Sequence, residues 1–190
     1  MDLINRPRRL RQNNAVRRMC RETRLSPDSL IYPVFVDETL SGKRPIPALD
    51  GQFHYGLDAV DEAVKSCIDA GVGRCILFGL PAKKDAQGSS AWDSKGVVQK
   101  AIRAIKAKYP DFYVITDVCM CEYTDHGHCG ILCGHDVDND KTLEVLSKTA
   151  LSHAEAGADM VAPSDMMDGR IAAIRASLDA HGFSNVPIMA

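Results

Sequence analysis

Residues 57–80 read LDAVDEAVKSCIDAGVGRCILFGL, a helix pattern followed directly by a strand pattern. Apolar residues recur at helical spacing from Leu57 to Ile68, and Gly71 suits the end of that helix. The six residues from Cys75 to Leu80 form a short apolar run, which is typical of a strand buried on both faces. A helix that leads into such a strand indicates a parallel sheet covered by helices.

The same alternation of strand and helix continues on both sides of this stretch. Further strands are predicted at residues 31–36, 112–116, 160–163 and 186–190. Further helices are predicted at residues 98–105, 143–154 and 171–178. Asn139 or Asp140 is the expected N-cap of the helix at 143–154.

The fold class is therefore α/β, and two architectures fit it: a doubly wound open sheet or a (β/α)8 TIM barrel. No Gly-x-Gly-x-x-Gly turn follows the first strand, which weakens the case for a dinucleotide-binding fold. A TIM barrel needs about 250 residues. We predict that residues 30–190 form a partial TIM-barrel domain, about its first half, with four βα units and the start of strand five.

Composition narrows the class of protein. No apolar run approaches the ~20 residues that span a bilayer, and the N-terminus lacks the apolar core of a secretory signal. We expect a cytoplasmic protein that binds no membrane. The chain has seven cysteines, for which a disulfide framework is then unexpected. Cys67 and Cys75 lie in apolar patterns and are predicted to be core residues.

The first 30 residues are strongly basic. They carry eight arginines against three acidic residues, although the whole chain has a net charge of −2. Such a segment suits a nucleic-acid contact, a transit peptide or an arm that docks on an acidic partner surface. Four apolar residues lie among the arginines, and no aromatic residue is present to stack on bases: Leu10, Val16, Met19 and Leu25. We favour an arm at residues 1–29 and expect no nucleic-acid partner.

The chemistry is concentrated at residues 116–130, TDVCMCEYTDHGHCG, just after the strand predicted at 112–116. Cys119 and Cys121 are two residues apart, so both sulfurs point the same way in extended backbone. Cys129 follows a loop that contains Gly127 and can fold back. Three thiolates suit Zn²⁺, and the C-terminal end of a barrel strand is where barrel enzymes place their active sites.

Spacing alone leaves the kind of metal site open. A catalytic zinc would keep three protein ligands and an open position, whereas a structural zinc would take a fourth ligand. Free thiols without a metal are a third reading. The candidates for a fourth ligand are Cys133, His126, His128 and His135.

Polar residues next to this stretch are candidates for substrate contact. Asp117 lies at the end of the third strand and Asp125 inside the loop; either suits the orientation of a ligand or substrate amine, and Asp125 also fits a solvated loop residue. Ser164 and Asp165 follow the strand at 160–163. They fit either helix caps or, for Ser164, a contact to substrate.

These motifs resemble the porphobilinogen synthase (5-aminolevulinate dehydratase) family over residues 4–189. The resemblance rests on four stretches in the family's order: Arg6–Arg11, Asp117–Gly130, Asp136–Asp140 and Ala162–Gly169. It implies a barrel enzyme that condenses two molecules of 5-aminolevulinate to porphobilinogen with loss of two waters. It also implies a catalytic Zn²⁺ on Cys119, Cys121 and Cys129, and a homo-oligomer, commonly an octamer, joined through N-terminal arms.

The resemblance also implies two lysines that hold substrate as Schiff bases, at positions beyond Ala190. None of the ten lysines between Lys43 and Lys148 matches them. The Mg²⁺ site of many members is likewise expected outside residues 1–190. We therefore expect the 190-residue chain alone to be inactive and to be a fragment of an ordinary enzyme. The alternatives are a truncated, non-catalytic zinc-binding or assembly protein, and a different Schiff-base barrel enzyme, which would not explain the clustered cysteines.

Overall fold

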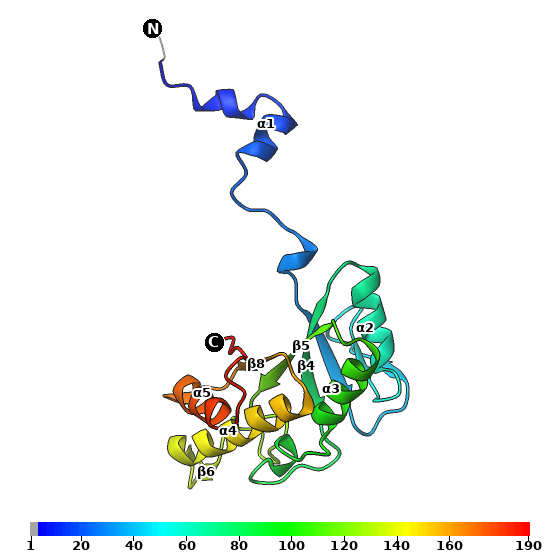
Figure 1. Cartoon of the computed structure of the whole chain (residues 1–190), viewed down its shortest axis with the longest axis vertical. Helices are drawn as coiled ribbons and strands as arrows, with labels where there is room; N and C mark the ends of the chain where they lie inside the picture. Colours follow the sequence, from blue (N-terminus) through cyan, green and yellow to red (C-terminus); the bar gives the residue numbers. More distant parts are fainter. Residues whose placement is uncertain (1–3) are drawn as a thin grey trace.

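The computed structural model describes residues 4–190, so the first three residues of the predicted arm lie outside it. Its centre is a six-stranded sheet with the order β2-β3-β1-β4-β5-β8 (Figure 1). Five of these strands are parallel, and β2 (Lys43–Pro45) runs antiparallel to β3 (Phe53–Tyr55). The other four strands are the predicted ones: β1 (Tyr32–Asp37), β4 (Arg74–Leu80), β5 (Tyr113–Val118) and β8 (Met160–Pro163).

Four helices follow the predicted pattern and lie in a row. They are α2 (Val60–Asp69), α3 (Val97–Lys108), α4 (Asn139–Ala156) and α5 (Arg170–Ala180). Each contacts the next, α2 with α3, α3 with α4 and α4 with α5. The structure also contains short 3-10 helices and a two-stranded hairpin: η1 (Pro7–Arg11), η2 (Pro27–Ser29), η3 (Ser89–Ala91), β6 (Leu132–Cys133) and β7 (Asp136–Val137).

One face of the sheet carries the core. Alternate residues of β4 are buried, and Cys75 and Leu77 pack with residues of α2 and α3 at 0% exposure. A second cluster joins β5 and β8 to α4 and α5. On the other face, the rings of Phe35 and Phe78 stack 5.2 Å apart and stay half-buried. The prediction that the strand at Cys75–Leu80 is buried on both faces is therefore wrong for β4, in which only every second side chain is buried.

The four predicted βα units are confirmed, and a closed barrel is absent from residues 4–190. The strand predicted at 186–190 is reduced to one parallel bridge between Ile188 and Val161. The N-cap of α4 is Asp138, whose side chain accepts from the Lys141 N–H, and neither Asn139 nor Asp140 takes that place. The cap therefore lies one residue before Asn139 and two before Asp140, and the helix begins at Asn139.

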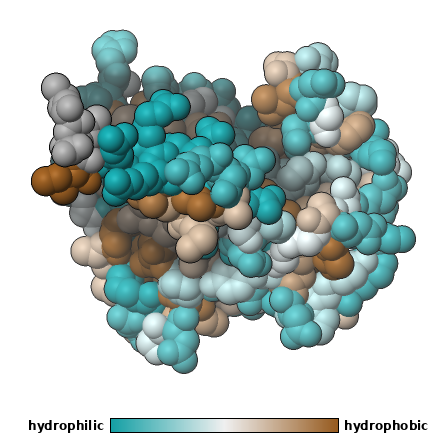
Figure 2. Space-filling view, turned by 90° about the horizontal axis from the view of Figure 1, so that it is seen from above, coloured by the Kyte–Doolittle hydropathy of each residue, from teal (hydrophilic) through white to brown (hydrophobic). Residues whose placement is uncertain are grey.

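The predicted arm extends away from the sheet (Figure 1). It contains α1 (Asn14–Met19), and none of its described residues is buried. Met19 is 77% exposed and Leu25 is 89% exposed, so the arm's apolar residues do not pack within this chain. Hydrophobic residues also lie among hydrophilic ones on the face from which the arm rises (Figure 2). No helix of residues 4–190 combines the length and hydropathy that a bilayer span requires.

Candidate metal centre at the carboxyl edge of the sheet

The candidate site lies where β5 and β8 end side by side. The two strands are parallel, with Asp117 opposite Ala162 and Val118 opposite Pro163. The pairing continues one step further, because the Ser164 N–H donates to the Val118 carbonyl at 3.3 Å. Parallel strands share one carboxyl edge, so the segments that follow β5 and β8 meet there.

Three cysteine thiols converge at this edge. The Sγ atoms of Cys119, Cys121 and Cys129 all lie within 4.8 Å of one another, and the first two are 3.5 Å apart. Cys119 is buried, whereas the other two are half-buried. The return of Cys129 to the strand end, which the sequence predicted from Gly127 in the loop, is therefore confirmed.

The four candidates for a fourth protein ligand do not join this cluster. Cys133 and His135 are exposed on the β6–β7 hairpin. His126 has one ring nitrogen 3.3 Å from the Ala86 carbonyl, and the other accepts from the His128 N–H. Among residues 4–190, the three cysteines are the only group of three or more His, Cys, Asp or Glu side chains whose ligand atoms converge closely enough to share a metal. A metal there would keep an open coordination position, as catalytic zinc sites do.

The surroundings of the thiols favour a cation. Burial raises the pKa of the Cys119 thiol to about 12. Burial also raises the pKa of Cys121, and the neighbouring Glu122 carboxylate, which accepts from its thiol at 3.2 Å, adds to the increase. Thiols whose pKa is raised in this way, as at Cys119 and Cys121, ionise near neutral pH only when a metal ion supplies positive charge beside them. The donor set therefore fits a thiolate-binding metal.

Asp117 is the titratable group next to the thiols. Its side chain is buried, and burial raises its pKa to about 7. A hydrogen bond with Ser164 acts in the opposite direction, while the negative charges of Glu122 and Asp165 raise the pKa further. A carboxyl group with this pKa can both give and take a proton near neutral pH.

The residues after β8 do not cap the next helix. The N-cap of α5 is Gly169, which makes no side-chain capping bond. Ser164 is exposed and faces Asp117, as its hydrogen bond requires. Asp165 accepts from the Met167 N–H at 2.7 Å and lies 3.5 Å from Arg170 Nε. The helix-cap reading of Ser164 and Asp165 is therefore wrong, and Asp125 is an exposed loop residue.

Sequence reasoning missed Glu122 as part of the site. The sequence signal for Glu122 was its position directly after Cys121, because in irregular backbone the carboxylate of the next residue can contact the cysteine thiol. It also missed the contact between this loop and the segment before α3, for which the sequence carried no signal.

The fold and the site define an α/β protein with a cluster of three thiols, able to hold a metal, at the carboxyl edge of a parallel sheet. The chain matches the family model described as delta-aminolevulinic acid dehydratase over residues 4–190. It belongs to that family.

Relatives agree with this membership. The delta-aminolevulinic acid dehydratase of Ruminiclostridium josui is 57% identical over 98% of this chain and 91% of its own length. That of Archaeoglobus fulgidus is 54% identical over 97% of this chain and 57% of its own length. The crystal structure of the Toxoplasma gondii enzyme, in complex with the reaction product porphobilinogen, matches with a TM-score of 0.93 at 37% identity. This chain covers 54% of that structure, so it spans little more than half of several relatives.

Proposed function

We propose that this chain carries the metal-binding portion of a porphobilinogen synthase, a lyase that condenses two molecules of 5-aminolevulinate to porphobilinogen with loss of two waters. The observation that carries the proposal is the convergence of Cys119, Cys121 and Cys129 beside Asp117 at the carboxyl edge of the sheet. Membership of the delta-aminolevulinic acid dehydratase family supports it.

The proposed metal is Zn²⁺, held by Cys119, Cys121 and Cys129. Three thiolates with no fourth protein ligand among residues 4–190 match the ligand type of zinc and leave room for substrate. When bound, the ion would supply Lewis acidity to a substrate carbonyl or amine.

Asp117 and Ser164 are the proposed catalytic residues of this segment. Loss of water from a carbinol needs a proton at the leaving oxygen, and the neighbouring amine must lose one. The carboxyl group of Asp117, with its pKa near 7, holds a transferable proton at this position. The exposed hydroxyl of Ser164 orients that carboxyl group and is positioned to reach substrate.

The Schiff-base lysines and the Mg²⁺ site that the family resemblance implies are proposed to lie outside residues 1–190. On this proposal, the 190-residue chain alone binds zinc but turns over no substrate, because it lacks the amine nucleophile. The compartment proposed for the enzyme is the cytoplasm.

A homo-oligomer, with an octamer as the specific proposal, accounts for the arm. Leu10, Met19 and Leu25 stand exposed on a segment rich in arginine. A second copy of the chain with an acidic, partly apolar surface would cover them. Size-exclusion chromatography with light scattering on the protein and on a variant without residues 1–29 tests this: the variant should fall to a smaller assembly.

The test of function is trapping of the substrate imine. The native protein from its source is incubated with 5-aminolevulinate and borohydride, and its intact mass is measured. A species well above the 20.7 kDa of this chain, carrying a reduced adduct, supports a dehydratase that contains this segment. A species of 20.7 kDa without an adduct supports the alternative, a non-catalytic zinc-binding or assembly protein.

A further inference from the structure

The hydrogen bonds within the loop that carries the cysteines close only local turns. Residues 119–130 contain no helix or strand. Within the loop, the N–H groups of Tyr123 and Thr124 both donate to the Met120 carbonyl at 2.9 Å, which closes one turn. Thr124 Oγ1 donates to the His128 carbonyl, which closes a second. Cys121 lies in the first turn and Cys129 follows the second, so neither turn fixes their spacing and contacts from outside the loop contribute to it.

One such contact comes from the segment between β4 and α3. The Asp85 N–H donates to the Tyr123 carbonyl at 3.3 Å, and the Asp125 N–H donates to the Asp85 carbonyl at 3.1 Å. These two bonds form a parallel bridge between Asp85 and Thr124. The contact extends by one residue along both segments, since His126 Nε2 lies 3.3 Å from the Ala86 carbonyl. The backbone at Asp85 is therefore paired with the cysteine loop as a strand would be.

The two segments also pack closely at Gly88. Its φ of 63° lies in the left-handed region that favours glycine. A Cβ atom at this position would lie 2.6 Å from Met120 Cε and 3.2 Å from Tyr123 Cβ. Met120 lies between Cys119 and Cys121 and is fully buried. Close approach at Gly88 therefore fixes the residue that separates two of the three ligands.

The carboxylate of Asp85 organises this contact. Its Oδ1 accepts from the Gln87 N–H at 2.9 Å and the Ser89 N–H at 3.0 Å, and Oδ2 accepts from Ser89 Oγ. The Ser89 hydroxyl first, and then these N–H groups, hold the pKa of the carboxyl group below its usual value. The turn at residues 85–89 is thus closed by the Asp85 side chain together with the Gly88 N–H, which donates to the Asp85 carbonyl at 3.0 Å, and the backbone of Asp85 also pairs with the cysteine loop.

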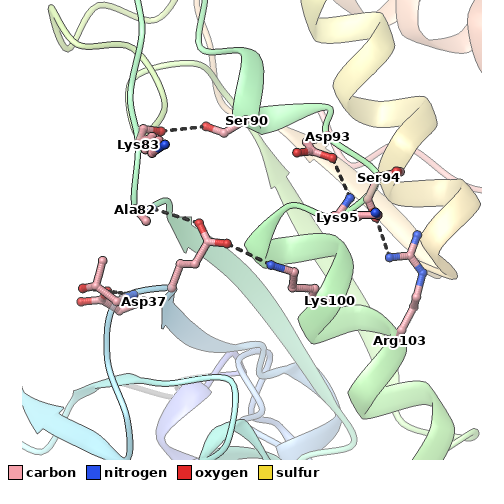
Figure 3. A network of polar contacts seen from close by, with 11 residues as sticks. Asp37, Ala82, Lys83, Ser90, Asp93, Ser94, Lys95, Lys100 and Arg103 are labelled. Atoms are coloured by element: carbon pink, nitrogen blue, oxygen red, sulfur yellow. Dashed lines mark hydrogen bonds and ion pairs between the residues drawn. The ribbon is translucent and has the colours of Figure 1, made fainter.

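The base of the same segment is anchored elsewhere. Ser90 Oγ donates to the Lys83 carbonyl, and the Ala82 N–H donates to Glu38, which also accepts from Lys100 Nζ (Figure 3). The Asp93 carboxylate closes a separate turn by accepting from the Lys95 N–H at 2.8 Å (Figure 3). The segment is therefore fixed to Glu38, the residue after β1, which is itself bonded to α3, and the 85–89 turn connects this anchored segment to the cysteine loop.

We propose that Asp85 is a positioning residue for the metal centre: it closes the 85–89 turn, which holds Cys121 and Cys129 at metal-binding spacing. The inference rests on the proposed metal site and adds a residue that contacts no ligand atom. Its loss should lower metal affinity by about tenfold, the lower end of the range for residues that orient metal ligands.

The experiment measures metal affinity directly. The metal-free protein is titrated with Co²⁺, and Zn²⁺ affinity is then obtained by competition while the thiolate-to-cobalt absorption is followed. Asp85→Ala should bind both ions about tenfold more weakly, with a broadened cobalt spectrum. Asp85→Asn keeps an oxygen that accepts from the N–H groups of Gln87 and Ser89, so it should restore wild-type affinity.

Asp93→Ala is the matched control. It removes an exposed carboxylate that closes a turn in the same segment, but that turn makes none of the contacts with the cysteine loop described above. It should leave metal affinity unchanged. Thermal unfolding and circular dichroism of each metal-free variant separate loosened ligands from global unfolding.

The outcomes separate the two proposals. If the wild type takes up neither ion, the proposed metal centre itself fails. If the wild type binds but Asp85→Ala binds equally well, or loses no more affinity than Asp93→Ala, the positioning role is overturned while the metal centre stands. If Asp85→Asn is as weak as Asp85→Ala, the carboxylate charge rather than the turn matters, which also overturns the proposal.

Discussion

The arm at residues 4–29 contains only short helices and the cysteine loop at residues 119–130 contains no helix or strand, and the two segments differ in what surrounds them. No described arm residue is buried, and the Arg74 side chain anchors the arm's end through Asp28. The cysteine loop has buried residues at Cys119, Met120 and Tyr123. Order in irregular backbone therefore depends on neighbours from distant parts of the chain.

The largest effect is expected at the ligands themselves. Cys121→Ser should lower Zn²⁺ affinity on the order of a thousandfold, since one of three thiolates is lost from a site whose total binding energy is large. Turnover of the complete enzyme should fall with zinc content. The measurement is metal analysis after dialysis against a weak chelator. Cys20→Ser, in the exposed arm, is the control and should keep the metal; equal zinc content in the two variants would contradict the ligand set.

Truncation of an apolar side chain should give the next largest difference, between the folded core and the arm. Leu146 on α4 is fully buried in the second core cluster, so Leu146→Ala should lower the free energy of unfolding by about 2–5 kcal/mol. Leu25→Ala removes the same atoms from an exposed arm residue and should change the free energy of unfolding by less than about 0.5 kcal/mol. Denaturant unfolding of the two variants checks this. Similar losses would mean that the arm packs on the body in solution.

Acid should destabilise the helix layer through His153. This side chain is fully buried, with Nδ1 3.0 Å from Thr116 Oγ1 and no partner for Nε2 in the described structure. Burial lowers the pKa of His153 to about 3 from an ordinary value of 6.5. Between these two pH values the unfolded chain binds a proton at this histidine and the folded chain does not. Stability should therefore fall as pH decreases from about 6.5 toward 3, by up to a few kcal/mol.

The variant His153→Gln keeps a hydrogen-bonding side chain without this titration. Its unfolding free energy, measured from pH 7 to pH 4, should decline less steeply than that of the wild type. Asp117 titrates in both proteins, so the difference between the two curves isolates His153. His181→Gln, at the exposed end of α5, should leave the slope unchanged. Parallel curves for His153→Gln and the wild type would contradict this role.

The smallest effect on stability is expected from charge changes in the arm. Arg17→Glu alters an exposed residue of α1 and should leave the free energy of unfolding within about 0.5 kcal/mol of the wild type. If the arm docks on an acidic surface of a second copy, the same change should shift the assembly toward smaller species at low salt. Light scattering measures that shift. An unchanged assembly would argue against electrostatic docking of the arm.

Much of the fold could be predicted because its signals are local. The helical spacing from Leu57 to Ile68 and the apolar run from Cys75 to Leu80 each indicate one element, and α2 and β4 confirm both. The short strands β2 and β3 could not be predicted. Each has only three residues, and pairing with a neighbour rather than an apolar pattern makes them strands.

The sequence by itself determined the alternation of strands and helices, the family and the three cysteines of the candidate site, because periodicity and residue type are properties of neighbouring residues. Only the tertiary structure decided which polar groups complete the site. Cys133 and three histidines were equal candidates by spacing, and the path of the backbone left all four out of the cluster. The contact of Asp85 with Thr124 joins residues 39 positions apart. No local sequence pattern predicts it, because it depends on the paths of two loops that follow adjacent strands.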